Sequence, residues 1–124
     1  NVALSTQGTW TCPVNRGNNF NTTNGTFTAP VTGAYMISYG ITVSSNNNSA
    51  GDGWSANIYL NNSPYFDVEI NYAQGSVSGE ERHSGNTLVM QLIKDDAIQV
   101  GTDGLNGSTS FAVLYATLSG HLIG

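Results

Sequence analysis

Charge is scarce in this chain. Charged side chains make up 9% of the 124 residues, and only three of them are basic: Arg16, Arg82 and Lys94. The formal net charge is −5 at pH 7. Nucleic acids and anionic membranes both require clustered Lys and Arg, so we expect neither as a partner. No apolar run approaches the roughly 18 residues of a membrane-spanning helix. A coiled coil or helical bundle is also excluded, because it needs abundant Ala, Glu, Lys, Leu and Arg.

Cysteine is nearly absent as well. Cys12 stands alone, so no disulfide can form within the chain. We expect a secreted, extracellular protein from the low charge, the many Ser, Thr and Asn residues, and the start at Asn1 without a methionine. In that compartment an unpaired cysteine favours an intermolecular disulfide. A buried thiol that packs as a small hydrophobe is the alternative.

Small polar residues are abundant. Gly, Ser, Thr and Asn account for 56 of the 124 residues, while 39% are hydrophobic and 10% aromatic. The hydrophobic residues arrive in patterned bursts, which excludes disorder. A chain of this length corresponds to one domain, residues 1–124, because domains typically run to about 100–150 residues.

Hydrophobic residues alternate with a period of two, which predicts half-buried strands. The clearest strand covers 33–43, with Tyr35 and Tyr39 on one face. Asn61–Pro64 predicts a hairpin turn between strands over 54–60 and 65–70, and Lys94-Asp95-Asp96 predicts a second turn. A final strand over 111–123 is apolar on both faces, with Phe111, Val113 and Tyr115 on one of them. Gly- and Asn-rich clusters predict turns at 21–25, 44–53, 75–85 and 102–110.

This pattern is typical of an all-β antiparallel sandwich or jelly roll of about eight to ten strands. Strands that are apolar on both faces in so small a protein indicate that another subunit covers one sheet face. We therefore expect a closed homo-oligomer, in which Tyr35, Tyr39, Phe111 and Tyr115 are core or interface aromatics.

Three spaced segments carry a resemblance to a known family. Asn15, Phe20, Phe27 and the run Gly33-Ala34-Tyr35-Met36-Ile37-Ser38-Tyr39 resemble the signature of the complement C1q globular-head family. Ser84-Gly85-Asn86 leading into Leu88–Leu92 resembles its penultimate hairpin. Ser119-Gly120-His121-Leu122-Ile123 is similar to its terminal strand, where His121 replaces a Phe. The resemblance is colinear over nearly the whole chain.

The resemblance implies a ten-stranded jelly-roll sandwich of the C1q and tumour necrosis factor type that assembles as a homotrimer through its sheet faces. It also implies a non-enzymatic recognition protein. A head without a collagen-like stalk looks most like the invertebrate lectins of the family, which act in innate-immune pattern recognition. The expected ligands are glycans, including N-acetylated or acidic sugars. A protein ligand for a receptor, or the structural knob of a trimeric fibre, are the alternatives.

Chemistry beyond binding has little support in the sequence. Asp67 and Glu69 lie two apart on a strand and share a face, as paired catalytic carboxylates do, but a solvated strand face explains them better. No Gly-x-Ser-x-Gly turn positions a nucleophile. We expect no cofactor and no metal site, with one weak exception. Calcium needs several oxygen ligands, which Asp95-Asp96 or Asp103 with nearby carbonyl groups would supply, whereas turn formation is the alternative role of Asp95-Asp96. The resemblance to the family implies calcium as a candidate, because some relatives bind it.

A sugar site needs a flat aromatic ring and planar polar groups that fix hydroxyls. Trp54, Tyr65 and Tyr72 stand at strand edges beside polar loops and are the predicted stacking rings. Core or interface packing is the alternative for each. Glu81, Arg82 and His83 form the densest polar cluster and are predicted, from an irregular loop, to grip an acidic or N-acetylated sugar.

Overall fold

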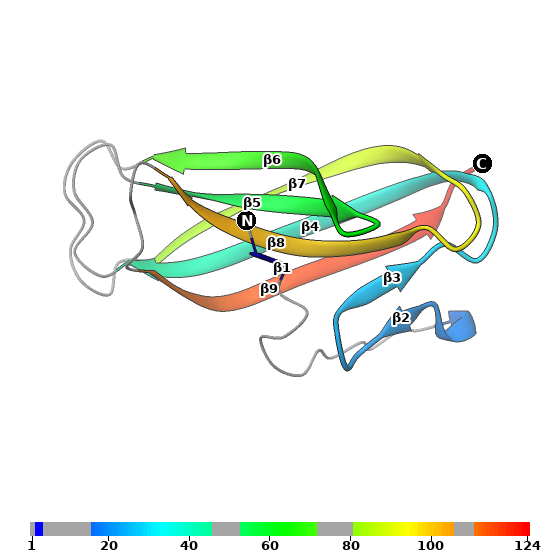
Figure 1. Cartoon of the computed structure of the whole chain (residues 1–124), viewed down its shortest axis with the longest axis horizontal. Helices are drawn as coiled ribbons and strands as arrows, with labels where there is room; N and C mark the ends of the chain where they lie inside the picture. The colour runs from blue at the N-terminus through cyan, green and yellow to red at the C-terminus, as the bar shows by residue number, and fades with distance from the viewer. Residues whose placement is uncertain (1, 4–15, 46–52, 72–80, 106–110) are drawn as a thin grey trace.

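The computed structural model describes residues 2–3, 16–45, 53–71, 81–105 and 111–124, which form a two-layered β-sandwich (Figure 1). One sheet has the order β7 (Glu81–Leu92), β4 (Gly33–Ser45), β9 (Phe111–Leu122). The other has the order β2 (Phe20–Asn21), β3 (Thr26–Thr28), β8 (Ala97–Leu105), β5 (Gly53–Leu60), β6 (Ser63–Asn71), and β1 (Val2–Ala3) also pairs with β8. A short 3₁₀ turn, η2, covers Arg16–Asn18. Every strand pair in these ranges is antiparallel, which confirms the predicted sandwich.

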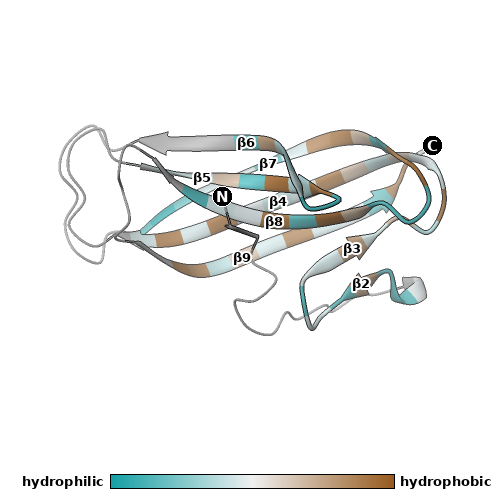
Figure 2. Cartoon of the chain, in the orientation of Figure 1, coloured by the Kyte–Doolittle hydropathy of each residue, from teal (hydrophilic) through white to brown (hydrophobic). Residues whose placement is uncertain are grey.

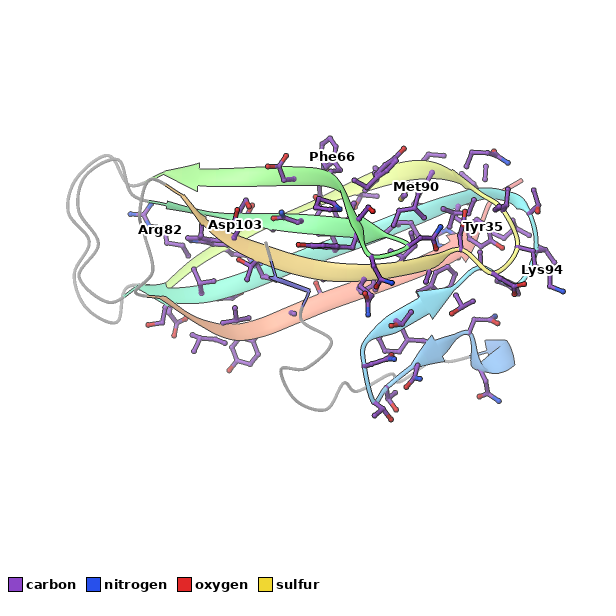
Figure 3. All side chains as sticks on the ribbon, in the orientation of Figure 1. Tyr35, Phe66, Arg82, Met90, Lys94 and Asp103 are labelled. Atoms are coloured by element: carbon purple, nitrogen blue, oxygen red, sulfur yellow. The ribbon has the colours of Figure 1, made fainter. Side chains whose placement is uncertain are left out.

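The core lies between the two sheets. Strand β4 contributes its odd-numbered residues from Tyr35 to Val43, and β5 contributes Trp54, Ala56 and Ile58. The predicted alternation of β4 is confirmed, because these residues are buried while their even-numbered neighbours are half-buried, Gly40 excepted. The hydropathy colours show the same banding along β4 and β7 (Figure 2). Labelled Tyr35 and Met90, both buried, mark the end of the core nearest the C-terminus (Figure 3).

Both predicted hairpin turns are present. Asn61 and Asn62 join β5 to β6 with φ of 50° and 66°, the left-handed conformation that Asn tolerates. Asp95, at the β7–β8 turn, has φ of 74°. The polar side chains of these turns therefore have a structural use.

Two strands are longer than the sequence predicts. Strand β7 begins at Glu81, inside the cluster at 75–85 that was predicted as a turn, and β8 continues to Leu105. Gly and Ser residues in these segments mimic a turn signal, but Gly85 and Ser84 here pair with β4 over a regular ladder.

The face assignment of the last strand is also corrected. A register shift between Thr42 and Val43 leaves Leu114 as an extra residue on β9, so that Thr42 pairs with Tyr115 and Val43 with Val113. Such a bulge reverses which side chains face the core. Val113 packs against the core, whereas Tyr115 lies on the opposite, outward face.

Candidate functional site

The outward side of the three-stranded sheet is the most distinctive surface of the described residues, and we call it the sheet face. Its side chains form rows across β7, β4 and β9, because directly paired residues in neighbouring antiparallel strands point the same way. In chain order β7, β4, β9, the rows are Val89–Met36–His121, Thr87–Ser38–Ser119, Gly85–Gly40–Thr117 and His83–Thr42–Tyr115. The face thus changes from apolar to hydroxyl-rich along the strands.

A hollow of about 580 Å³ lies in the middle of these rows. Among the described residues, Asp, Glu, Lys and Arg are absent from its lining, which consists of Ser38, Tyr39, His83, Ser84, Gly85, Asn86, Thr87 and Thr117. Ser38 and Thr87 share a hydrogen bond of 2.7 Å, and the Thr87 backbone N–H donates to Asn86 Oδ1 at 2.8 Å. We call this feature the hydroxyl hollow. Its lining offers donors and acceptors to an uncharged polar group.

Two glycines shape the hydroxyl hollow. Strands β7 and β4 approach so closely that a Cβ on Gly85 would overlap the carbonyl oxygen of Tyr39 and the Cα of Gly40. A Cβ on Gly40 would lie 3.1 Å from His83 Cε1 and 3.2 Å from His83 Nε2. The imidazole therefore occupies the space that a Gly40 side chain would fill.

His83 is held in this position by one described hydrogen bond. Its Nδ1 lies 2.9 Å from Thr42 Oγ1 on the neighbouring strand. The Nε2 edge lies over Gly40, beside the hydroxyl hollow. Several described residues line the hollow with side chains that point outward from the sheet. Among these, His83 is the one titratable residue.

Large apolar side chains are exposed around the hollow. Tyr115 is 70% exposed and Val89 is 60% exposed, on rows to either side of it, and Leu114 of the bulge is exposed beside Tyr115. Apolar groups gathered on one face of a sheet in this way mark a surface that a partner covers.

The predicted cluster Glu81-Arg82-His83 does not converge on one ligand. These residues lie in the regular strand β7 and not in an irregular loop, so successive side chains point to opposite faces. Glu81 and His83 point outward on the sheet face, whereas Arg82 is half-buried and points the other way, at the end of the sandwich farthest from Lys94 (Figure 3). The irregular loop predicted for these residues is therefore wrong, while their predicted role in binding a sugar stays a prediction.

The three aromatic residues predicted to stack on a sugar lie in different surroundings. Trp54 is wholly buried in the core, so its ring offers no face to a sugar, and the prediction is wrong for this residue. Tyr72 lies outside the described residues. Tyr65 is 54% exposed and lies at a register shift in β6, where it is the extra residue between Pro64 and Phe66. Such an irregularity turns a side chain away from the regular ladder.

The remaining predicted residues are placed as follows. Tyr35 and Tyr39 are core residues, as expected, while Tyr115 is exposed on the sheet face. Phe111 lies on β9, and its side chain is outside the described part of the structure, as is Cys12, so their predicted roles stay predictions. Asp96 accepts hydrogen bonds from the Ile93 N–H and from Asn61 Nδ2, which gives it a role in the turn.

Within the described ranges, no three His, Cys, Asp or Glu side chains gather where they would hold a metal ion. The same ranges contain no helix long and apolar enough to cross a membrane. Sequence reasoning overlooked Ser38, Thr87 and Thr117 of the hydroxyl hollow. The signal for them was the series of small polar residues at Ser38, Gly40 and Thr42, on the outward side of an otherwise apolar strand.

Known proteins supply the last comparison. The family model described as C1q domain matches residues 10–123. A search of curated proteins finds no match. The chain is similar in structure to the globular domain of the zebrafish complement 1qA protein, with a TM-score of 0.52 and 20% sequence identity over 86% of this chain and 75% of that one. The match to the family model covers nearly the whole sequence, and the chain therefore belongs to the C1q domain family.

Proposed function

We propose that this C1q-domain protein is a secreted, non-enzymatic recognition protein that binds glycans as a homotrimer. The sheet face, where exposed apolar side chains surround a hollow, carries the assembly part of the proposal, and the exposed ring of Tyr65 on the other sheet carries the glycan site. C1q domains commonly oligomerise and bind ligands, are generally non-enzymatic and are usually found outside cells. The low charge of the chain favours uncharged polar ligands over phosphates.

The sheet face supports self-association. Tyr115 and Val89 are each more than half exposed on it, and Glu81 is its one charged residue, histidines aside, among those described. Depletion of charge and exposure of aromatic and aliphatic side chains are typical of the centre of protein interfaces. Homo-oligomers with closed symmetry are the usual assemblies. The resemblance to the C1q family implies that this assembly has three subunits.

A glycan site on the trimer must lie away from the buried sheet face. Of the predicted rings, Tyr65 is the one that the structure describes as exposed. Asn62 of the β5–β6 turn and Ser63 at the start of β6 are exposed next to it and offer amide and hydroxyl groups. Single shallow sites of this kind are weak, and three of them on one particle raise avidity by about 10²–10⁴-fold when geometry permits.

The test combines mass and binding. Analytical ultracentrifugation at neutral pH gives the oligomeric state, and a glycan array is then probed with the natively assembled protein. We expect a trimer that binds a subset of glycans, and a Tyr65→Ala variant that stays trimeric but loses most of its array signal. Tyr65→Phe, which keeps the ring, is the matched control. A trimer that binds no glycan contradicts the ligand class, and Tyr65→Ala binding like wild type contradicts the site.

A protein partner is the second candidate function. Val31, Ile93 and Ile123 are exposed near the end of the sandwich where the C-terminus lies. Backbone and side-chain bonds hold this end together, since Lys94 N–H donates to Thr32 Oγ1 and Ala34 N–H donates to the Gly124 carbonyl. A receptor that binds this end would lose affinity in Ile93→Asp while glycan binding by the same variant is unchanged.

A further inference from the structure

We propose that assembly through the sheet face is acid-sensitive, because both histidines of the chain lie on that face and must stay neutral between subunits. This inference rests on the proposed trimer. The chain has two histidines, His83 on β7 and His121 on β9. His83 pairs across the sheet with Thr42, and His121 pairs with Met36, so both side chains point outward with those residues. Each histidine is exposed in the single chain.

The two histidines stand in rows with the exposed apolar residues. His83 shares its row with Tyr115, and His121 shares its row with Val89. A second copy that covers Tyr115 and Val89 therefore also covers the histidines. Solvation of the imidazoles is then lost on assembly, and burial disfavours the charged form of histidine.

Compensating charges are few on this face. Around His83, strand β4 presents Gly40, Thr42 and Ser44, and β9 beyond it presents Tyr115 and Thr117, none of which carries charge at neutral pH. On β7 itself, Glu81 lies two residues before His83 and is the nearest carboxylate on the face.

The surroundings of His121 are less polar still. Met36 lies beside it on β4, Val89 beyond that on β7, and Ser119 two residues before it on β9. Gly124 lies beside Ala34, further along the sheet. Arg82 points to the other face of β7, and Lys94 lies in the β7–β8 turn. Protonation of both histidines thus adds two positive charges per subunit, and the described side chains of the face offer one carboxylate against them, that of Glu81.

The sign of the pH effect follows from this arrangement. An imidazole in water takes up a proton as pH falls through about 6.5, and burial between subunits opposes that uptake. Association is therefore strongest above that pH and weakens as pH falls below it. One pH unit below, each histidine that must stay neutral weakens the complex about 10-fold, so six in a trimer weaken it by up to roughly 10⁶-fold.

The experiment is sedimentation equilibrium of the whole chain between pH 7.5 and pH 5.5, with near-UV circular dichroism to show that the subunit stays folded. We expect a trimer at pH 7.5 that dissociates toward folded monomer at pH 5.5. The double variant H83Q/H121Q should remain trimeric at both pH values. Each single variant should reduce the slope of the logarithm of the dissociation constant against pH, which gives the contribution of each histidine even where the double variant assembles poorly. Glu81→Gln, which removes the carboxylate, should leave the direction of the pH effect unchanged and steepen it.

The outcomes separate this inference from the proposed trimer. A wild-type protein that is monomeric at pH 7.5 contradicts the trimer itself. A wild-type trimer equally stable at both pH values contradicts the histidine mechanism and leaves the trimer standing. Dissociation of wild type and H83Q/H121Q to the same extent, with equal slopes in the single variants, also overturns the mechanism, because other groups then take up the protons.

Discussion

Two buried tyrosines of strand β4 differ in their hydrogen bonding. The Tyr35 hydroxyl donates to the Val31 carbonyl at 2.7 Å, and its ring packs edge-on against Phe27 with 5.8 Å between centroids. The Tyr39 hydroxyl is buried with no hydrogen-bond partner in the described structure, and the side chain is 4% exposed. Burial, aided by the charge of Asp67, raises the pKa of Tyr39 to about 12. The two residues therefore form a matched pair for measuring the free energy that a buried hydroxyl costs when it lacks a hydrogen bond.

Tyr39→Phe should leave the free energy of unfolding at pH 7 unchanged or raise it by about 1 kcal/mol, because it removes a buried group that costs free energy when unpaired. Tyr35→Phe should lower it by about 1 kcal/mol, because a hydrogen bond is lost. Urea denaturation measures both. A loss of more than 1 kcal/mol in Tyr39→Phe would show that the hydroxyl has a partner, such as a buried water.

The same hydroxyl predicts a dependence on alkaline pH. Since Tyr39 ionises at a higher pH in the folded chain than in the unfolded one, the unfolded chain releases its proton first, and stability falls as pH rises from about 10 to about 12. The loss from this residue reaches about 2–3 kcal/mol. Tyr39→Phe should show a shallower loss over this range, and the pKa of Tyr59, also raised by burial, accounts for part of what remains.

At the scale of elements, Asn61 connects two hairpins. Its Nδ2 donates to Asp96 Oδ1 at 2.8 Å, its Oδ1 accepts from the Ala97 N–H at 2.9 Å, and its own N–H donates to the Ala97 carbonyl at 2.9 Å. The β5–β6 turn is thereby fixed to the β7–β8 turn. One side chain thus sets the spacing of β5 and β8 at this end of the sheet.

Substitutions at Asn61 separate the contribution of its side-chain hydrogen bonds to stability from that of its left-handed backbone conformation. Asn61→Gly keeps the positive φ but loses both side-chain bonds, and should lower the free energy of unfolding by about 1–3 kcal/mol. Asn61→Ala should cost about 1 kcal/mol more, because a Cβ disfavours the left-handed conformation. Thermal and urea unfolding measure the series. Equal stability of the two variants would show that the backbone conformation carries no cost here.

Most strands and turns were predictable from the sequence, because the patterns that indicate them involve only neighbouring residues. Alternation from Tyr35 to Ile41 and the Asn-rich turn at Asn61 depend only on neighbouring residues, and both predictions hold. The start of β7 and the bulge at Leu114 were missed, because they depend on the register with β4, which lies far away in the sequence. Local patterns do not encode which strand lies alongside.

The candidate site was less predictable than the fold. Residues that line the hydroxyl hollow come from three strands, and most of them are Ser, Thr or Gly residues that are ordinary in their own segments. Trp54 is of a residue type that is common in sugar-binding sites, yet it packs in the core. Aromatic rings occur both in binding sites and in cores. Only the cross-strand register shows which small polar residues meet.

At the scale of the whole molecule, the sheet face distinguishes assembly from ligand binding. Tyr115→Lys places a charge at an exposed position of this face, so the subunit should stay folded while the trimer dissociates. Tyr65→Lys, on the other sheet, is the matched control and should stay trimeric. Light scattering coupled to gel filtration gives both masses. Equal masses for the two variants would show that the sheet face is not the interface.

The position of β4 between β7 and β9 has a consequence for biosynthesis. Tyr35 pairs with Leu122, and Gly33 pairs with Leu92. The central strand β4 can therefore pair only after β7 and β9, which are translated much later, have been synthesised. Pairing over such separations is slow, because the conformational entropy of the intervening chain must be lost before the strands make any contact. The sheet face is completed only when β9 has left the ribosome. A chain that lacks β9 therefore presents an open edge of β4 to its neighbours.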